Sequence, residues 1–234
     1  MTLSVRRLGP GILFALCASA LASQAPSASA PAAALSGRVA LLLPPKVEID
    51  PGGSVIWIPG LRLLTSQAGS YEVTSRDKRF EPRILALPSG TKVKFPNVDS
   101  IYHNAFSLSP GNSFDLGLYR KGASRDVVLS TPGVVRVYCN IHPDMAASLM
   151  VVDGNVFSTV RTDGTYRIEG IPPGRYDVHI WSDVAGEQAV PLVLLAGRTT
   201  DWSPVLDATR YRRVAHTNKF GKTYPKGKNG ADRY

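Results

Sequence analysis

The chain has 234 residues, which is long enough for one large or two small domains. Its formal net charge is +9, but eight of its 27 basic residues follow Asp207, where Asp232 is the only acidic residue. Residues 23–207 are therefore close to neutral, which argues against a nucleic-acid-binding surface on the body of the protein.

The first 25 residues have the organisation of a secretory signal peptide. Arg6 and Arg7 precede an apolar run over residues 11–21, and the small residues of an Ala-x-Ala cleavage site follow it. The run is shorter than the ~20 residues that a membrane-spanning helix needs, and no later segment is long and apolar enough to span a membrane. We therefore expect a periplasmic or secreted protein without stable membrane insertion, in which residues 26–35 form a disordered linker.

Removal of the signal peptide leaves a single cysteine. The two cysteines of the chain are Cys17, inside the signal peptide, and Cys139. A lone thiol in an oxidising compartment cannot form an internal disulfide, and it is open to oxidation unless it is buried or bound to a metal. We therefore expect Cys139 to be protected by burial or by ligation.

Apolar residues recur with a period of two along most of the remaining chain, which is typical of strands with one buried face. Gly- and Pro-rich turns separate these segments, and the sequence shows no convincing amphipathic helix. We therefore expect an all-β fold, either a sandwich or a barrel. The expected strands include residues 91–95, 126–130, 134–139, 148–152, 165–168 and 175–181.

The expected strands fall into two blocks. We predict a first domain over residues 70–153 and a second β module over residues 154–206. Residues 36–68 also have a strand pattern, and we interpret them as N-terminal strands that complete the second module. The first domain would then be inserted into that module. Packing of Val39 and Trp57 against residues 70–153, and not against 154–206, would contradict this arrangement.

The segment YCNIHPDM, residues 138–145, places a thiol, an imidazole and a thioether within eight residues. Because side chains alternate along the preceding strand, Cys139 lies on its apolar face and points into the core. His142 and Met145 follow on a loop, since a proline between them cannot continue a strand ladder. Two histidines, one cysteine and a weak axial methionine are the ligands of electron-transfer copper centres. Three of these four ligands are present in this segment.

The second histidine must come from elsewhere in the chain. His103 is in the same block as Cys139, and we choose it for that reason. His179 is in the second block, and His216 is in the basic C-terminal segment. Zinc is the alternative metal, because cysteine and histidine bind it well although methionine does not. Met150 is the rival axial ligand, but it lies in an apolar strand where a methionine more often fills the core.

The segments FPNVDSIYHNAFS (95–107), FDLGLY (114–119) and VYCNIHPDM (137–145) resemble the cupredoxin family, which includes plastocyanin and amicyanin. The spacing Cys-x2-His-x2-Met is similar to the ligand loop of the amicyanin type. The layout of the chain also resembles periplasmic "methylamine utilization" proteins with a plastocyanin-like domain. This resemblance implies a Greek-key β-sandwich over residues 70–153 that holds one copper ion. The residues that it assigns are the ligands His103, Cys139 and His142, the axial ligand Met145, and Asn104, which would join the two ligand loops by hydrogen bonds.

The segment TDGTYRIEGIPPGRYDVHIW, residues 162–181, resembles a carboxypeptidase regulatory-like module, a β-sandwich of the transthyretin type. This second resemblance covers about 20 residues. It implies a smaller β-sandwich after the cupredoxin domain, and it implies no reaction.

Residues 207–234 are basic, rich in glycine and interleaved with aromatic residues. This composition is also found in nucleic-acid-binding segments, but export of the protein argues against such a partner. We expect a disordered tail that contacts acidic surfaces. A solvated terminus without a partner is the alternative.

The ligand set and the resemblance predict a periplasmic type 1 (blue) copper protein that carries one electron and is not an enzyme. Its partner would be another periplasmic redox protein, such as a dehydrogenase or a cytochrome. The alternative is a copper-binding or storage protein, or a surface-binding protein, in which the metal site is structural. The sequence contains no Ser-His-Asp layout and no phosphate-binding glycine loop that would indicate an enzyme.

Overall fold

The computed structural model of the chain describes residues 30–64, 69–212 and 216–224. Every regular element in these residues is a strand, so the prediction of an all-β fold is confirmed. Within the same ranges, no helix could cross a membrane. The predicted signal peptide and the first part of the predicted linker lie outside the described residues.

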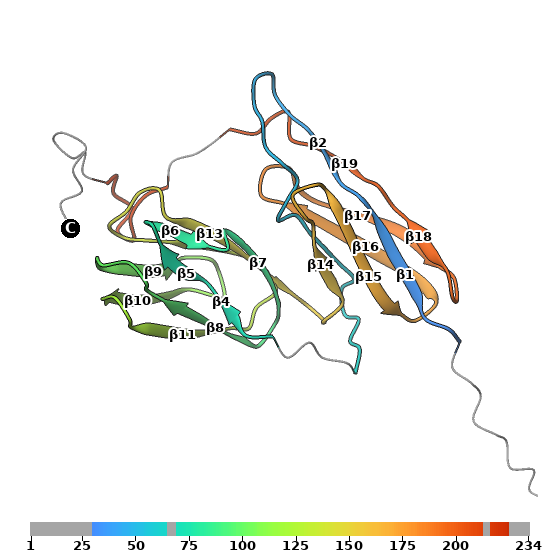
Figure 1. The fold of residues 1–234 in the computed structure, drawn as a ribbon, viewed down its shortest axis with the longest axis horizontal. Coiled ribbons are helices and arrows are strands. Elements are labelled where there is room, and N and C mark those ends of the chain that lie inside the picture. Colours follow the sequence, from blue (N-terminus) through green and yellow to red (C-terminus); the bar gives the residue numbers. More distant parts are fainter. Residues whose placement is uncertain (1–29, 65–68, 213–215, 225–234) are drawn as a thin grey trace, which may run out of the picture.

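Residues 71–152 form a two-sheet β-sandwich, which we call the first unit (Figure 1). One sheet has five strands in the order β10-β9-β12-β13-β7, and the other has three strands in the order β11-β8-β4. Strands β5 and β6 form a separate hairpin. The strands of this unit are β4 (Tyr71–Glu72), β5 (Thr74–Arg76), β6 (Arg79–Glu81), β7 (Ile84–Pro88), β8 (Thr91–Pro96), β9 (His103–Ser107), β10 (Phe114–Tyr119), β11 (Ser124–Leu129), β12 (Gly133–Tyr138) and β13 (Ala146–Val152).

Apolar side chains from both sheets form the core of the first unit. Val93 and Phe95 of β8 contribute from the three-stranded sheet, and Val135 and Val137 of β12 contribute from the five-stranded sheet. All four are fully buried. Cys139 follows β12 on the same face and belongs to the same cluster. The alternation of side chains along β12 therefore directs the thiol into the core.

The remaining strands form the second unit (Figure 1). Its sheets have the orders β15-β1-β18 and β14-β3-β16-β17, and β2 pairs with β19. The strands are β1 (Ala33–Arg38), β2 (Ala40–Leu42), β3 (Val55–Trp57), β14 (Phe157–Thr159), β15 (Thr165–Ile171), β16 (Gly174–Ser182), β17 (Gly186–Leu194), β18 (Thr199–Asp201) and β19 (Val205–Asp207).

The second unit is assembled from two separate stretches of the chain. β1, β2 and β3 pair only with strands that follow residue 156, and the first unit lies between these stretches in the sequence. Val39 packs in the core of the second unit with Tyr166 and Ile168. Trp57 belongs to a smaller cluster between the two units. The likeness of this unit to a transthyretin-type module stays a prediction.

The two units meet at an apolar cluster and at one carboxylate. The cluster joins Trp57 and Trp181 of the second unit to Met150 of the first. Asp183, which follows β16, accepts hydrogen bonds from Arg136 and, at 2.6 Å, from Arg83 of the first unit. Burial raises the pKa of Asp183, but the two guanidinium groups outweigh this and hold it below its ordinary value.

The last three residues of the predicted linker, residues 26–35, belong to a strand, and its first four lie outside the described residues. β1 begins at Ala33, and both Ala33 and Leu35 are buried in the core of the second unit. An alanine-rich stretch has the composition of a linker, but its small side chains also fit the inner face of a sheet. Composition alone does not distinguish these two outcomes.

The predicted disordered tail, residues 207–234, is in part an ordered segment. β19 ends at Asp207, and residues 216–224 lie on the first unit (Figure 1). Tyr224 and Lys219 of this segment hydrogen-bond to the loop that follows β12. Residues of this basic stretch thus contact the folded first unit, whereas the charge of the stretch had predicted disorder.

Candidate metal centre

Three of the predicted ligands lie together at one end of the first unit. One nitrogen of His103, one nitrogen of His142 and the sulfur of Cys139 all lie within 4.8 Å of one another, and all three residues are buried. In the described ranges no other group of three histidine, cysteine or carboxylate side chains has this arrangement. β9 begins at His103 and pairs with β12, which ends just before Cys139, so the sheet itself brings these two residues together.

The two histidines turn the same kind of atom toward the centre of this cluster. Nδ1 of His103 lies 3.1 Å from Nδ1 of His142, and Sγ of Cys139 lies 3.6 Å from Nδ1 of His142. The rings are tilted by 58° with their centroids 4.8 Å apart, so they do not stack face to face. Two imidazole nitrogens and one sulfur therefore converge on one buried point.

The outer nitrogen of His103 has a defined partner. Its Nε2 atom lies 2.7 Å from a carboxylate oxygen of Asp99, four residues earlier in the chain. The same carboxylate accepts hydrogen bonds from the backbone N–H groups of Asp77 and Lys78 at 2.7 and 2.9 Å. Burial raises the pKa of Asp99, but these hydrogen bonds and His103 together lower it below its ordinary value.

Asn104 links the ligand segments on the other side of the cluster. Its side-chain oxygen accepts a hydrogen bond from the backbone N–H of Asn140 at 3.2 Å, in the loop that carries His142. Its amide nitrogen donates to Asp115 at 2.7 Å and to the carbonyl of Gly117 at 3.0 Å. A side chain next to His103 is thus tied directly to the residue after Cys139.

Met145 closes the loop from Cys139. The N–H of Cys139 donates to the carbonyl of Met145, and the N–H of Met145 donates to the carbonyl of His142, each at 3.2 Å. Met145 is fully buried in the same apolar cluster as Cys139. Its role as the fourth ligand stays a prediction.

The residues that the sequence offered as rivals lie elsewhere. Met150 packs in the cluster between the two units, with Trp57 and Trp181. His179 is on β16 of the second unit, where its Nδ1 lies 2.7 Å from Glu187. Neither is part of the cluster of buried donors.

The cluster fits a soft cation. Burial raises the pKa of the Cys139 thiol, and backbone hydrogen bonds to it oppose this rise without cancelling it. A thiolate at this position therefore needs a positive charge beside it. Two imidazoles and a thiol suit copper, and so does the thioether that Met145 is predicted to add, whereas zinc would leave that thioether unused.

The C-terminal segment, residues 216–224, contacts three consecutive residues at the end of β12. The ring of His216 stacks on Tyr138, with centroids 4.2 Å apart, and the hydroxyl of Tyr224 donates to the carbonyl of Cys139 at 2.7 Å. The N–H of Lys219 donates to the side chain of Asn140 at 3.1 Å. Sequence reasoning missed these contacts.

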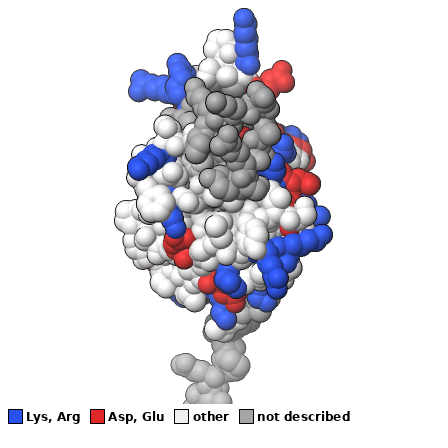
Figure 2. Space-filling view, turned by 90° about the vertical axis from the view of Figure 1, so that its left-hand side faces the viewer, with Lys and Arg blue, Asp and Glu red and all other residues white. Residues whose placement is uncertain are grey.

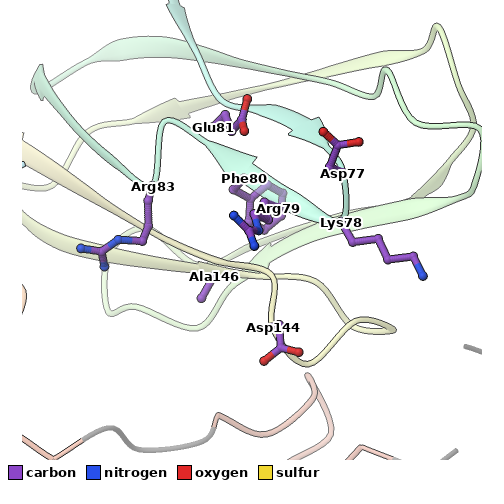
Figure 3. A pocket seen from close by; sticks show the side chains of 8 residues that line it. All are labelled: Asp77, Lys78, Arg79, Phe80, Glu81, Arg83, Asp144 and Ala146. Atoms are coloured by element: carbon purple, nitrogen blue, oxygen red, sulfur yellow. The ribbon is translucent and has the colours of Figure 1, made fainter. Parts of the chain in front are cut away.

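A cleft of about 720 Å³ opens beside the ligand loop (Figure 3). Charged side chains of both signs line it, and Asp144 reaches it from the loop between His142 and Met145. On the part of this face that is drawn in colour, Lys and Arg side chains are likewise interspersed with Asp and Glu (Figure 2). The lining residues are Asp77, Lys78, Arg79, Phe80, Glu81, Arg83, Asp144 and Ala146.

Comparisons with known proteins give structural neighbours only. No family model matches the sequence, and no curated protein matches it. Among solved structures, the purple cupredoxin from Nitrosopumilus maritimus is 23% identical, covers 35% of this chain and 99% of its own length, and has a TM-score of 0.32. A Cu(I) form of an amicyanin mutant is 17% identical, covers 41% of this chain and 97% of its own, and has a TM-score of 0.34. The chain is therefore similar to cupredoxin structures over about two-fifths of its length.

Proposed function

We propose that this chain binds one copper ion through His103, Cys139 and His142, with Met145 as the fourth ligand, in a type 1 (blue) copper centre. One observation carries the proposal: three soft or borderline donors, one from the start of β9 and two from the segment after β12, converge within 4.8 Å, and all three are buried. Donors of this kind select copper over the hard cations that prefer oxygen.

Strand pairing and hydrogen bonds fix the positions of the proposed ligands without the metal. Neighbouring strands fix His103 and Cys139, while the hydrogen bonds between residues 139 and 145 fix the loop. Asp99 contacts the outer nitrogen of His103, and Asn104 ties the neighbouring backbone to Asn140. Bound copper would supply a one-electron couple, and ligands that are fixed in advance need little rearrangement when the charge at the site changes. We therefore propose a one-electron carrier and not an enzyme.

The setting of this carrier follows from the N-terminal sequence. A signal peptide over residues 1–25 would place the protein in the periplasm or outside the cell. A redox protein of the same compartment, such as a dehydrogenase or a cytochrome, would be its partner. The charges of both signs that line the cleft beside Asp144 would limit long-range attraction by a partner of one sign.

A second function is favoured by the burial of the ligands. His142, the most exposed of the four, shows only 3% of its surface, so no ligand edge is open to a partner. A copper-binding or storage protein with a structural site has no need of an exposed edge. Reversible electrochemistry on the copper-loaded protein supports the carrier, whereas a colourless protein that holds only Cu(I) or zinc supports the second function.

The proposal is tested by Cys139→Ser. The wild-type protein loaded with Cu(II) should show an intense thiolate-to-copper band in the visible spectrum, and the variant should lack it, because serine offers no thiolate. Metal content measured on both proteins separates loss of colour from loss of metal. A band that survives in the variant rejects the assignment of the site.

A further inference from the structure

One carboxylate connects a ligand histidine to a hairpin of the first unit. Asp99 lies in the loop between β8 and β9, and only 13% of its side chain is exposed. One of its oxygens accepts the N–H of Asp77, and the other accepts the N–H of Lys78 and faces Nε2 of His103. All three distances are between 2.7 and 2.9 Å.

The hairpin turn between β5 and β6 is shaped to receive an anion. Asp77 and Lys78 have φ angles of 49° and 56°, which is the left-handed conformation at both central positions of a two-residue turn. Neither residue is glycine, so this conformation costs energy unless the surroundings favour it. Two successive N–H groups in such a turn point the same way and bind anionic oxygens. Asp99 is the group that they bind.

The loop that carries Asp99 is itself held. The backbone N–H of Asp99 donates to the side chain of Asn97 at 2.9 Å. The amide of Asn97, which is 1% exposed, donates to the carbonyls of Ile101 and Tyr119 at 2.8 and 3.0 Å. The position of the carboxylate is therefore set from both sides, by its own loop and by the hairpin.

These contacts determine which ring nitrogen of His103 carries the proton. The Asp99 oxygen that faces His103 already accepts a backbone N–H, so it acts as an acceptor and Nε2 of His103 carries the proton. In neutral histidine the other nitrogen, Nδ1, is then unprotonated. That atom is the one that faces His142 and the Cys139 cluster.

We propose that Asp99 is the positioning residue of the metal centre, which fixes the Nε2–H tautomer of His103 and lowers the reduction potential by adding negative charge to this ligand. The second part rests on the proposed copper function, while the first part concerns the metal-free protein as well. A carboxylate behind a ligand histidine raises its basicity, and this favours the more highly charged ion, Cu(II), over Cu(I).

The tautomer is measured on metal-free wild-type protein labelled with 15N at histidine. The nitrogen shifts of His103 should report a protonated Nε2 and an unprotonated Nδ1. In Asp99→Asn this preference should weaken. A wild-type His103 protonated at Nδ1 overturns the proposal, and this result needs neither a variant nor copper.

The potential is measured on the copper-loaded Asp99→Asn protein. Loss of an outer-shell partner should weaken Cu(II) binding by about 10- to 100-fold. With Cu(I) binding unchanged, this raises the one-electron potential by about 60–120 mV. Asp126→Asn is the matched control, because its carboxylate lies on β11, in the sheet that carries none of the proposed ligands, where it is 4.0 Å from Lys92. Equal shifts in the two variants overturn the positioning role.

The proposed role of Asp99 and the proposed copper function can be rejected independently of each other. If wild-type protein has no visible copper band, the proposed function is wrong, and the tautomer measurement still decides the role of Asp99. If the band is present and Asp99→Asn leaves both the potential and the tautomer unchanged, the function stands and the role of Asp99 is rejected.

Discussion

The two β units differ in the polar side chains that they bury. In the second unit, the described residues bury Ser54 and Ser182 and no other polar side chain. The first unit buries both histidines of the proposed metal centre together with asparagines and serines. Its buried polar residues are Ser75, Asn97, His103, Asn104, Ser107, Asn112, His142 and Ser148. Burying such groups costs free energy unless they are hydrogen-bonded, so a unit that retains them does so for a reason other than packing.

Three of these residues, Asn97, His103 and Asn104, define the polar end of the first unit, and the apolar core meets this end at Cys139. Val93, Phe95 and Leu149 fill the space between its sheets, while Asn97, His103 and Asn104 lie where β8 ends and β9 begins. In the described residues of the second unit, the apolar core has no corresponding polar end. On the proposed function, the metal centre belongs to the first unit, and among the described residues the second unit has no comparable group of three histidine, cysteine or carboxylate side chains.

The largest effect should come from removing a histidine of the cluster. His103→Ala takes away one of three converging donors, so copper affinity should fall by more than about 100-fold, the upper range for loss of an outer partner alone. His179→Ala, in the second unit, is the matched control and should bind copper as the wild type does. Metal titration of both proteins makes the comparison. Equal losses of copper affinity in the two variants would contradict the placement of the copper site in the first unit.

A pair of core substitutions separates stability from the site. Leu149 and Ile180 are both fully buried, one in the first unit and one in the second. Replacing either by alanine should cost about 2–5 kcal/mol of unfolding free energy, measured by denaturant titration. Only Leu149→Ala should alter the visible spectrum, because Leu149 packs in the cluster that holds Cys139. A change in the visible spectrum of folded Ile180→Ala would contradict the claim that the copper site depends on the first unit alone.

The contribution of Asp183, at the junction of the two units, to the unfolding free energy should depend on pH. At neutral pH, Asp183→Asn should lower the unfolding free energy by about 1.5–3 kcal/mol, because the charged hydrogen bonds to Arg83 and Arg136 are weakened. The pKa of Asp183 is lowered in the folded protein, so this stabilisation is complete above the ordinary aspartate pKa of about 4 and is lost as the pH falls through the folded value. The difference between wild type and variant should shrink below about pH 4. A difference that stays constant there would exclude the ion pairs as its cause.

Much of this division follows from local patterns in the sequence. The period of two predicted the strands and the inward face of Cys139, because both depend only on alternation along one strand. The joint occurrence of His103, Cys139 and His142 identified the residues that the structure brings within 4.8 Å. Met145 is placed at the end of the same loop, and its contact with a metal stays a prediction.

Other features depend on contacts that no local pattern reports. An aspartate four residues before a histidine occurs in many turns, and its role at Asp99 depends on a hairpin more than 20 residues away. The contact of Tyr224 with Cys139 spans 85 residues. The start of β1 in an alanine-rich stretch depends on strands β15 and β18, which are far away in the sequence.

The smallest effect should come from Tyr224→Phe, which asks whether the polar end of the first unit needs support from outside that unit. Burial raises the pKa of Tyr224, so its hydroxyl stays protonated at neutral pH and donates to the carbonyl of Cys139. Loss of this one hydrogen bond should cost about 0.5–1.5 kcal/mol and should make the C-terminal segment more susceptible to limited proteolysis. Tyr102→Phe, at an exposed tyrosine of the first unit, is the control. Because the ligand side chains are untouched, the visible band should remain in both variants. Equal rates of proteolysis would show that the segment is held by the His216 and Lys219 contacts without the help of this hydroxyl.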